Sequence, residues 1–191
     1  MATAELVRPD VELKHFVFFA LPPPSEVVPR LVSLGDRLSA EGELRGRRTP
    51  AHRFHVSLVG LGAYAAVPKR TIERAREVAS MIRFPSFVLA FDRVMSFGGN
   101  ADSRSLVLTG GDGLIGADML HARLYAALAG AGLVAPHARA FAPHLTLSCE
   151  DGPRPTRFID PIAWRASELR LVDGAQGKGR HDILGRWSLA E

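Results

Sequence analysis

The sequence predicts an α+β fold with two similar lobes, because a strand, a helix and a second strand follow one another twice along the chain. In each copy the second strand begins at a histidine, His55 in the first and His144 in the second. The chain has 191 residues, of which 47% are hydrophobic and 23% are charged, as is typical of a globular protein with one substantial core. We therefore expect residues 14–191 to form a single bilobal domain and residues 1–13 a polar tail.

The first copy covers residues 15–58. Residues 15–21 are aromatic and branched and stop at three prolines, which predicts a buried strand. Apolar residues at helical spacing follow and predict a helix that ends at Gly42. Residues 43–53 carry arginines, glycine and proline, which favours a loop, and residues 54–58 form the second strand.

A helix that opens at Pro68 connects the two copies. Its apolar stripe at helical spacing is formed by Ile72, Ala75, Val78 and Ile82. After a strand at residues 87–94, the second copy comprises a strand at 105–108, a helix at 114–131 and a strand at 145–147. Strands at residues 169–172 and 187–189 close the chain.

Two motifs share the pattern histidine, apolar, hydroxyl, apolar: HVSL at residues 55–58 and HLTL at residues 144–147. Because side chains alternate between the faces of a strand, His55 and Ser57 project together while their apolar neighbours anchor the other face in the core. The same holds for His144 and Thr146. If the lobes face one another, the cleft between them holds two imidazoles and two hydroxyls.

These four groups suit phosphodiester cleavage, in which one group removes a proton from the attacking oxygen and another protonates the departing oxygen. Two histidines can divide these tasks, because imidazole titrates near pH ~6.5 and one neutral and one protonated ring can coexist. His55 and His144 are therefore the expected catalytic residues, and Ser57 and Thr146 are expected to bind the phosphate oxygens. The chemistry requires no cofactor and no metal.

The charge of the chain indicates an anionic partner. The net charge is +4 and the isoelectric point is about 9.8. Four arginines before the first motif are candidates for RNA contact: Arg45, Arg47, Arg48 and Arg53. The single cysteine excludes an internal disulfide, and no apolar run is long enough to span a bilayer. We expect a cytoplasmic monomer that binds RNA ends or small cyclic nucleotides and has no membrane partner.

The passages FHVSLVGLG at residues 54–62 and FAPHLTLSC at residues 141–149 resemble the paired signatures of the two-histidine phosphoesterase superfamily. More narrowly, they resemble its 2',5' RNA ligase-like branch, also called RNA 2',3'-cyclic phosphodiesterases. The resemblance implies antiparallel sheets with outer helices that line a central cleft. It also implies metal-independent opening of a 2',3'-cyclic phosphate to a 2'-phosphate, in which His144 activates water and His55 protonates the leaving 3' oxygen. RNA ligation is left open.

The chain departs from the family pattern at three positions. Ser57 stands where threonine is commoner, which keeps the hydroxyl. His181 stands where relatives often have tyrosine, which points to a shifted substrate preference. Cys149 stands where many relatives carry arginine, so that Arg139, Arg154 or the loop arginines would have to supply that contact.

Two residues near the motifs have structural interpretations. Cys149 lies five residues beyond His144, so we expect it on the other side of the strand as a small buried hydrophobe, which argues against a Cys–His nucleophile. His121 falls on the apolar face of its helix and is expected to be packed.

Three other functions compete with this hypothesis. An RNA-binding module could use the histidines and arginines to hold phosphate without chemistry, and steep salt dependence without turnover would favour it. A metal hydrolase would need a third protein ligand, which the motifs do not offer. A serine hydrolase would need a Gly-x-Ser-x-Gly turn, which is missing from the sequence.

Overall fold

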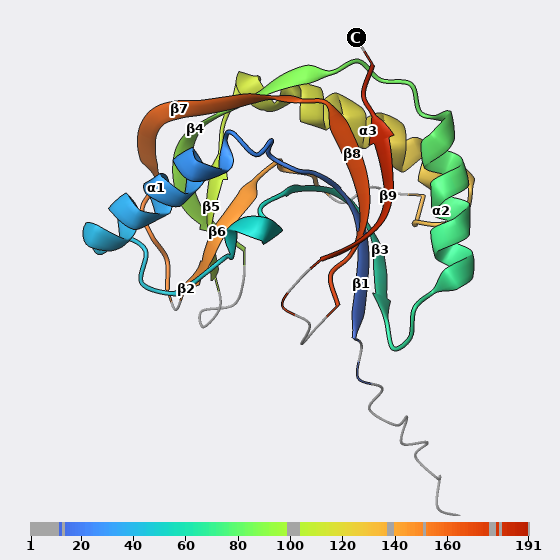
Figure 1. Cartoon of the computed structure of the whole chain (residues 1–191), viewed down its shortest axis with the longest axis horizontal. Helices are drawn as coiled ribbons and strands as arrows, with labels where there is room; N and C mark the ends of the chain where they lie inside the picture. Colours follow the sequence, from blue (N-terminus) through green and yellow to red (C-terminus); the bar gives the residue numbers. More distant parts are fainter. Residues whose placement is uncertain are drawn as a thin grey trace, which may run out of the picture.

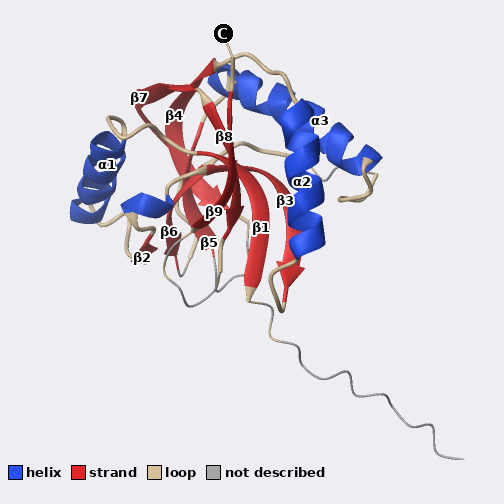
Figure 2. Cartoon of the chain, turned by 45° about the vertical axis from the view of Figure 1, so that its right-hand side comes forward, coloured by secondary structure: helices blue, strands red, loops and turns tan. Residues whose placement is uncertain are grey.

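The computed structural model describes residues 12, 14–98, 104–136, 140–150, 152–175, 179 and 181–190. Figure 2 shows their helices and strands. The helices are α1 (Val28–Ala40), α2 (Lys69–Met81) and α3 (Ile115–Gly130), with short 3-10 turns at Ala51–Arg53 and Asp112–Leu114. The strands are β1 (His15–Leu21), β2 (Arg47–Arg48), β3 (Val56–Tyr64), β4 (Phe87–Phe97), β5 (Arg104–Thr109), β6 (Leu145–Glu150), β7 (Arg157–Ala166), β8 (Glu168–Asp173) and β9 (Asp182–Ser188).

The strands form one antiparallel sheet in the order β7-β4-β5-β6-β3-β1-β8-β9, with β2 added on β6. This sheet consists of a first half, β3-β1-β8-β9, and a second half, β7-β4-β5-β6. A single residue pair, Val56 with Leu145, joins β3 of the first half to β6 of the second. The predicted repeat of strand, helix and strand is confirmed, because β1-α1-β3 in the first half corresponds to β5-α3-β6 in the second.

The helices pack on one face of the sheet. Buried residues of all three helices belong to the same apolar cluster as Val56, Leu58, Leu145 and Leu147, the apolar members of the two motifs. Figure 1 shows α1 beside β7 and β2, at the opposite end of the molecule from α2, which lies beside β9. Burying each leucine of this cluster contributes about 1.5–3 kcal/mol, so the apolar half of each motif fixes which way its strand faces. The predicted α+β fold of two antiparallel lobes with outer helices is confirmed.

A β-bulge in β6 corrects the prediction for Cys149. The pairing of β5 with β6 shifts between Leu106 and Val107, which leaves one extra residue in β6 and reverses the alternation beyond it. Thr146 pairs with Val107 and Cys149 pairs with Ser105. Since Ser105 and Val107 are two residues apart on β5, Cys149 lies on the same face as Thr146, and its side chain is exposed. The expectation of a buried cysteine on the opposite side of the strand was wrong.

Three segments differ from the sequence-based expectation. Residues 43–53, which were expected to form a loop, contain the short strand β2 and a 3-10 turn. No strand was expected at β7, which contains Pro161 and is bulged opposite β4 between Phe91 and Arg93. A proline inside a strand is tolerated at a sheet edge, where its missing N–H costs no ladder bond. The last strand lies at Asp182–Ser188 rather than at residues 187–189. Within the described residues, no helix combines the length and apolar character needed to cross a membrane.

Candidate active site

The pair Val56–Leu145 brings the two motifs together. Both residues are fully buried, so their neighbours along each strand project from the other face. In the antiparallel register of this pair, His55 lies across from Thr146, and Ser57 across from His144. We call the face that carries these four side chains the histidine face. Segments far apart in the sequence thus place two imidazoles and two hydroxyls on one surface.

Both imidazoles are held in the same way. The Nδ1–H of His55 donates to the carbonyl oxygen of Arg53 at 2.7 Å, and the Nδ1–H of His144 donates to that of Ala142 at 2.8 Å. Because a carbonyl can only accept, these bonds place the proton of each neutral ring on Nδ1 and leave Nε2 as the reactive nitrogen. On His55, Nε2 lies 2.9 Å from Oγ of Ser57, whose hydroxyl donates to it.

The surroundings of His55 disfavour its charged form. Burial lowers the pKa of His55, and the positive charges of Arg53 and His144 lower it further, against the opposing effect of the Arg53 carbonyl. His55 is therefore neutral at pH 7 in the free protein.

Aromatic rings flank both histidines. The ring of Phe18 on β1 lies 5.0 Å from that of His55, and the ring of Phe97 on β4 lies 4.8 Å from that of His144. Beside His55, Phe18 forms a small apolar cluster with Ala20 and Val172, separate from the main core. The histidine face therefore has an apolar floor in the first half of the sheet, which limits the access of water to the rings.

A further histidine, His181, is part of the same surface. Its ring stands edge-on to that of His55 at 5.1 Å, and its Nε2 accepts a hydrogen bond of 3.2 Å from Nε of Arg53. Burial, together with the charges of His55 and Arg53, lowers the pKa of His181 to about 4. His181 is thus a neutral acceptor that orients Arg53. A small pocket of about 50 Å³ is lined by His55 and His181 together with Arg170 and Ile183.

The profile of the 2'-5' RNA ligase superfamily matches residues 23–177 of this sequence. The chain belongs to the 2'-5' RNA ligase superfamily. The match spans both motifs and the strands that carry them, and it confirms the resemblance to two-histidine phosphoesterases. A search of curated protein sequences gives no match.

Several solved structures share the fold. LigT of E. coli in its apo form is 25% identical, with a TM-score of 0.74 over 94% of this chain and 100% of LigT. A protein described only as a phosphoesterase is 24% identical, with a TM-score of 0.72 over 93% of this chain and 99% of its own. TT0787 of Thermus thermophilus is 20% identical, with a TM-score of 0.71 over 91% and 97% of the two chains. Structures of LigT with ATP and with 3'-AMP also match, each at 24% identity.

The four arginines singled out in this superfamily member have different surroundings. Arg45 donates from Nε to the carbonyl of Gly42 at 2.7 Å, and Arg48 forms an ion pair with Asp36. Arg47 is exposed and lies in β2. Arg53 contacts the first motif, through the carbonyl that accepts from His55 and through its bond to His181.

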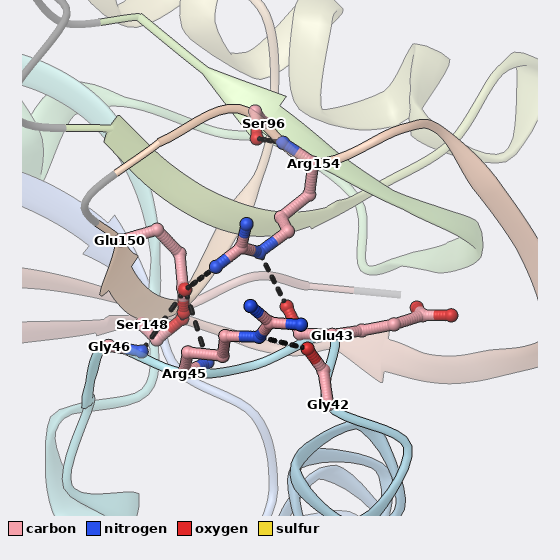
Figure 3. Close-up of polar contacts among 8 residues, drawn as sticks. All are labelled: Gly42, Glu43, Arg45, Gly46, Ser96, Ser148, Glu150 and Arg154. Carbon is pink, nitrogen blue, oxygen red and sulfur yellow. Dashed lines mark hydrogen bonds and ion pairs between the residues drawn. The ribbon is translucent and has the colours of Figure 1, made fainter.

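A buried carboxylate fixes the arginine segment to β6 (Figure 3). Glu150 accepts bonds of 3.1 Å from the backbone amides of both Arg45 and Gly46, a bond of 3.2 Å from Arg154 and a further bond from Ser148. Burial by itself raises the pKa of Glu150, but the bonds from Ser148, Arg45 and Gly46 and the charge of Arg154 outweigh it and hold the pKa below its usual value. We call this group the Glu150 clamp.

The clamp bears on the expectation that Arg154 supplies the contact of an arginine at the position of Cys149. Arg154 also donates to the carbonyl of Glu43 at 2.9 Å. Its guanidinium therefore neutralises Glu150 and binds the backbone of the segment that follows α1. Arg139 lies outside the described residues. Sequence reasoning found neither the clamp nor the bond between Arg53 and His181, because their partners are more than one hundred residues apart.

Two further observations concern His121 and metal binding. His121 is packed as predicted, since its ring stacks on Phe141 at 3.9 Å and its Nδ1 bonds to the carbonyl of Leu58 at 2.9 Å. Across the described ranges, no group of three or more histidine, cysteine, aspartate or glutamate side chains is placed to hold a metal ion.

Proposed function

We propose that this protein hydrolyses 2',3'-cyclic phosphate ends of RNA to 2'-phosphates by acid–base catalysis with His55 and His144, without a metal or cofactor. The observation that supports this most directly is the pair Val56–Leu145, which sets both motifs against each other with two Nε2 atoms on one face. The structures of E. coli LigT with ATP and with 3'-AMP, each 24% identical to this chain, support a nucleotide ligand.

The reaction needs one proton removed and one supplied. Water attacks the phosphorus atom, its proton passes to a neutral Nε2, the bond from phosphorus to the 3' oxygen breaks, and the other, protonated Nε2 gives its proton to that oxygen. Ser57 and Thr146 donate hydrogen bonds to the non-bridging oxygens and stabilise the negative charge of the transition state. In the free protein the Ser57 hydroxyl bonds to His55, so it has to turn toward the phosphate and thereby frees Nε2 of His55.

Two arguments give opposite roles to the histidines. The lowered pKa of His55 leaves that ring neutral, as a general base must be. The resemblance to the family assigns the base role to His144 instead. A substrate whose leaving oxygen is replaced by sulfur separates the two, because a thiolate departs without a proton. The variant that lacks the acid recovers turnover on this substrate, and the variant that lacks the base does not.

The central experiment uses an RNA oligonucleotide with a 2',3'-cyclic phosphate end, in the presence of a chelator. The wild-type protein should release a 2'-phosphate, and His55→Ala and His144→Ala should each lower kcat by about 10²–10⁴-fold. His15→Asn is the matched control, since His15 is a strand histidine bound to Asp173 at the end of β1. Full activity in both alanine variants would refute the proposal. Salt-dependent RNA binding without turnover would favour the binding module instead.

A further inference from the structure

A row of side chains crosses the second half of the sheet from His144. Leu108 pairs with Leu145, so the next residue of β5, Thr109, lies beside His144, and its Oγ1 donates to the carbonyl of Pro143 at 3.0 Å. Thr109 pairs with Arg93 on β4, and Arg93 pairs with Phe158 on β7. Neighbouring strands are about 4.8 Å apart, so Phe158 lies roughly 14 Å from His144 across three strands.

This row belongs to the histidine face. Leu145, Leu108 and Val94, the residues next to His144, Thr109 and Arg93, are all part of the main core on the other face. Because side chains alternate, the row from His144 to Phe158 projects from the same surface as the two motifs. It continues the candidate active site toward the β7 edge of the sheet.

The end of the row is an aromatic ring with one covered side. Phe158 is 71% exposed, more than any other large hydrophobic residue in the described part of the chain. The guanidinium carbon of Arg93 lies over its ring, 5.1 Å from the ring centre. Arg93 is itself fixed by two bonds to Asp92, at 2.7 and 3.2 Å. The arginine therefore orients the ring, and the ring keeps an open side for a ligand.

We propose that Phe158, held by Arg93, is a stacking platform for a nucleobase of an RNA strand whose cyclic phosphate end is bound at His55 and His144. This inference rests on the proposed function and extends it to the substrate class. A mononucleotide at the histidines is too short to reach a ring roughly 14 Å away. An RNA strand reaches it with a base beyond its terminal nucleoside. Base stacking on an aromatic side chain accepts any base, so the platform selects strands over mononucleotides without reading sequence.

The test compares two substrates in the Phe158→Ala variant. Loss of one stacked base corresponds to about 1–3 kcal/mol, so kcat/KM for a cyclic-ended RNA hexamer should fall by about 5- to 150-fold. The value for 2',3'-cyclic AMP should not change. Phe158→Trp should restore turnover of the hexamer. Val88→Ala is the matched control, because Val88 is an exposed apolar residue of β4 that pairs with Arg165, away from the row.

Binding measured without turnover keeps this inference separate from the proposed function. The affinity for an RNA hexamer with a 3'-phosphate end, followed by fluorescence anisotropy, should fall by a similar factor in Phe158→Ala and stay unchanged in Val88→Ala. Equal hexamer affinity in wild type and Phe158→Ala would overturn the platform, whatever the turnover. Weaker binding by Phe158→Ala in a protein that hydrolyses neither substrate would support the platform and refute the proposed function.

Discussion

Replacing Glu150 by glutamine keeps the shape of the Glu150 clamp and removes its charge. The Glu150 side chain is fully buried and the Arg154 side chain is 22% exposed, so the variant leaves a largely buried guanidinium without its counter-charge. Breaking a buried ion pair from one side costs about 3–5 kcal/mol, and the partial exposure of Arg154 reduces this to about 2–3 kcal/mol. For a chain of this size, that loss lowers Tm by about 5–10 °C.

The effect should depend on pH with a defined sign. Because the folded state holds the pKa of Glu150 below its usual value, the stabilisation is fully present above the unfolded-state pKa near 4.5. It is lost as the pH falls through the folded-state pKa, where the wild-type carboxylate also becomes neutral. The Tm difference between wild type and Glu150→Gln should therefore be largest at pH 7 and narrow below pH ~4.5.

Thermal unfolding followed by circular dichroism measures this difference. Glu77→Gln is the control, since Glu77 forms an exposed ion pair with Arg74 three residues earlier on α2, and such pairs contribute little. The reasoning is refuted if Glu150→Gln and Glu77→Gln lower Tm equally at pH 7. A difference for Glu150→Gln that is constant down to pH 3 would also contradict it.

Two predictions concern the site itself. Ser57→Ala and Thr146→Ala should each lower kcat by about 10–100-fold, as expected for the loss of one hydrogen bond to a charged group. Ser57→Thr should retain activity. Steady-state kinetics that show an unchanged kcat in either alanine variant would exclude phosphate binding by that hydroxyl. Arg53→Gln removes a positive charge beside His55 but keeps the backbone carbonyl, so the pKa of His55 should rise and, if His55 is the base, the acidic limb of the kcat/KM profile should move to higher pH. A limb that does not move would rule out a base role for His55.

Local sequence patterns predicted the parts of this protein that depend on local physics. Strand and helix periodicity located β1 and the three helices, and the alternation within each motif predicted that His55 and Ser57 share a face. The prediction that Cys149 lies on the opposite face from His144, made from side-chain alternation, was wrong. A bulge depends on how two strands pair, and the sequence of one strand does not show this pairing. β7 was missed because Pro161 is disfavoured in an interior strand and becomes acceptable only at a sheet edge.

Local sequence patterns also did not predict contacts between residues that lie far apart in the sequence. The arginines before the first motif looked alike in sequence, yet Arg48 pairs with α1 and Arg53 lies against His181. The amides of Arg45 and Gly46 are satisfied by a carboxylate from β6. A local composition rule could only describe this segment as basic, because the partners that separate its members come from elsewhere in the fold.

The single pair between the halves explains why the sheet can hold a site at its centre. Beyond Leu145, β2 occupies the edge of β6, and Thr49 donates its amide to the carbonyl of Leu147 at 2.8 Å. On the other side, the residue that would face Leu58 is Pro143, which has no N–H to donate, and the Leu58 carbonyl is taken by His121. Both continuations of the ladder are blocked, so β3 and β6 diverge from the pair Val56–Leu145. The residues next to that pair are the two histidines and the two hydroxyl residues. The pair brings these four residues together, and because the strands separate on both sides of it, no further strand pairing covers them.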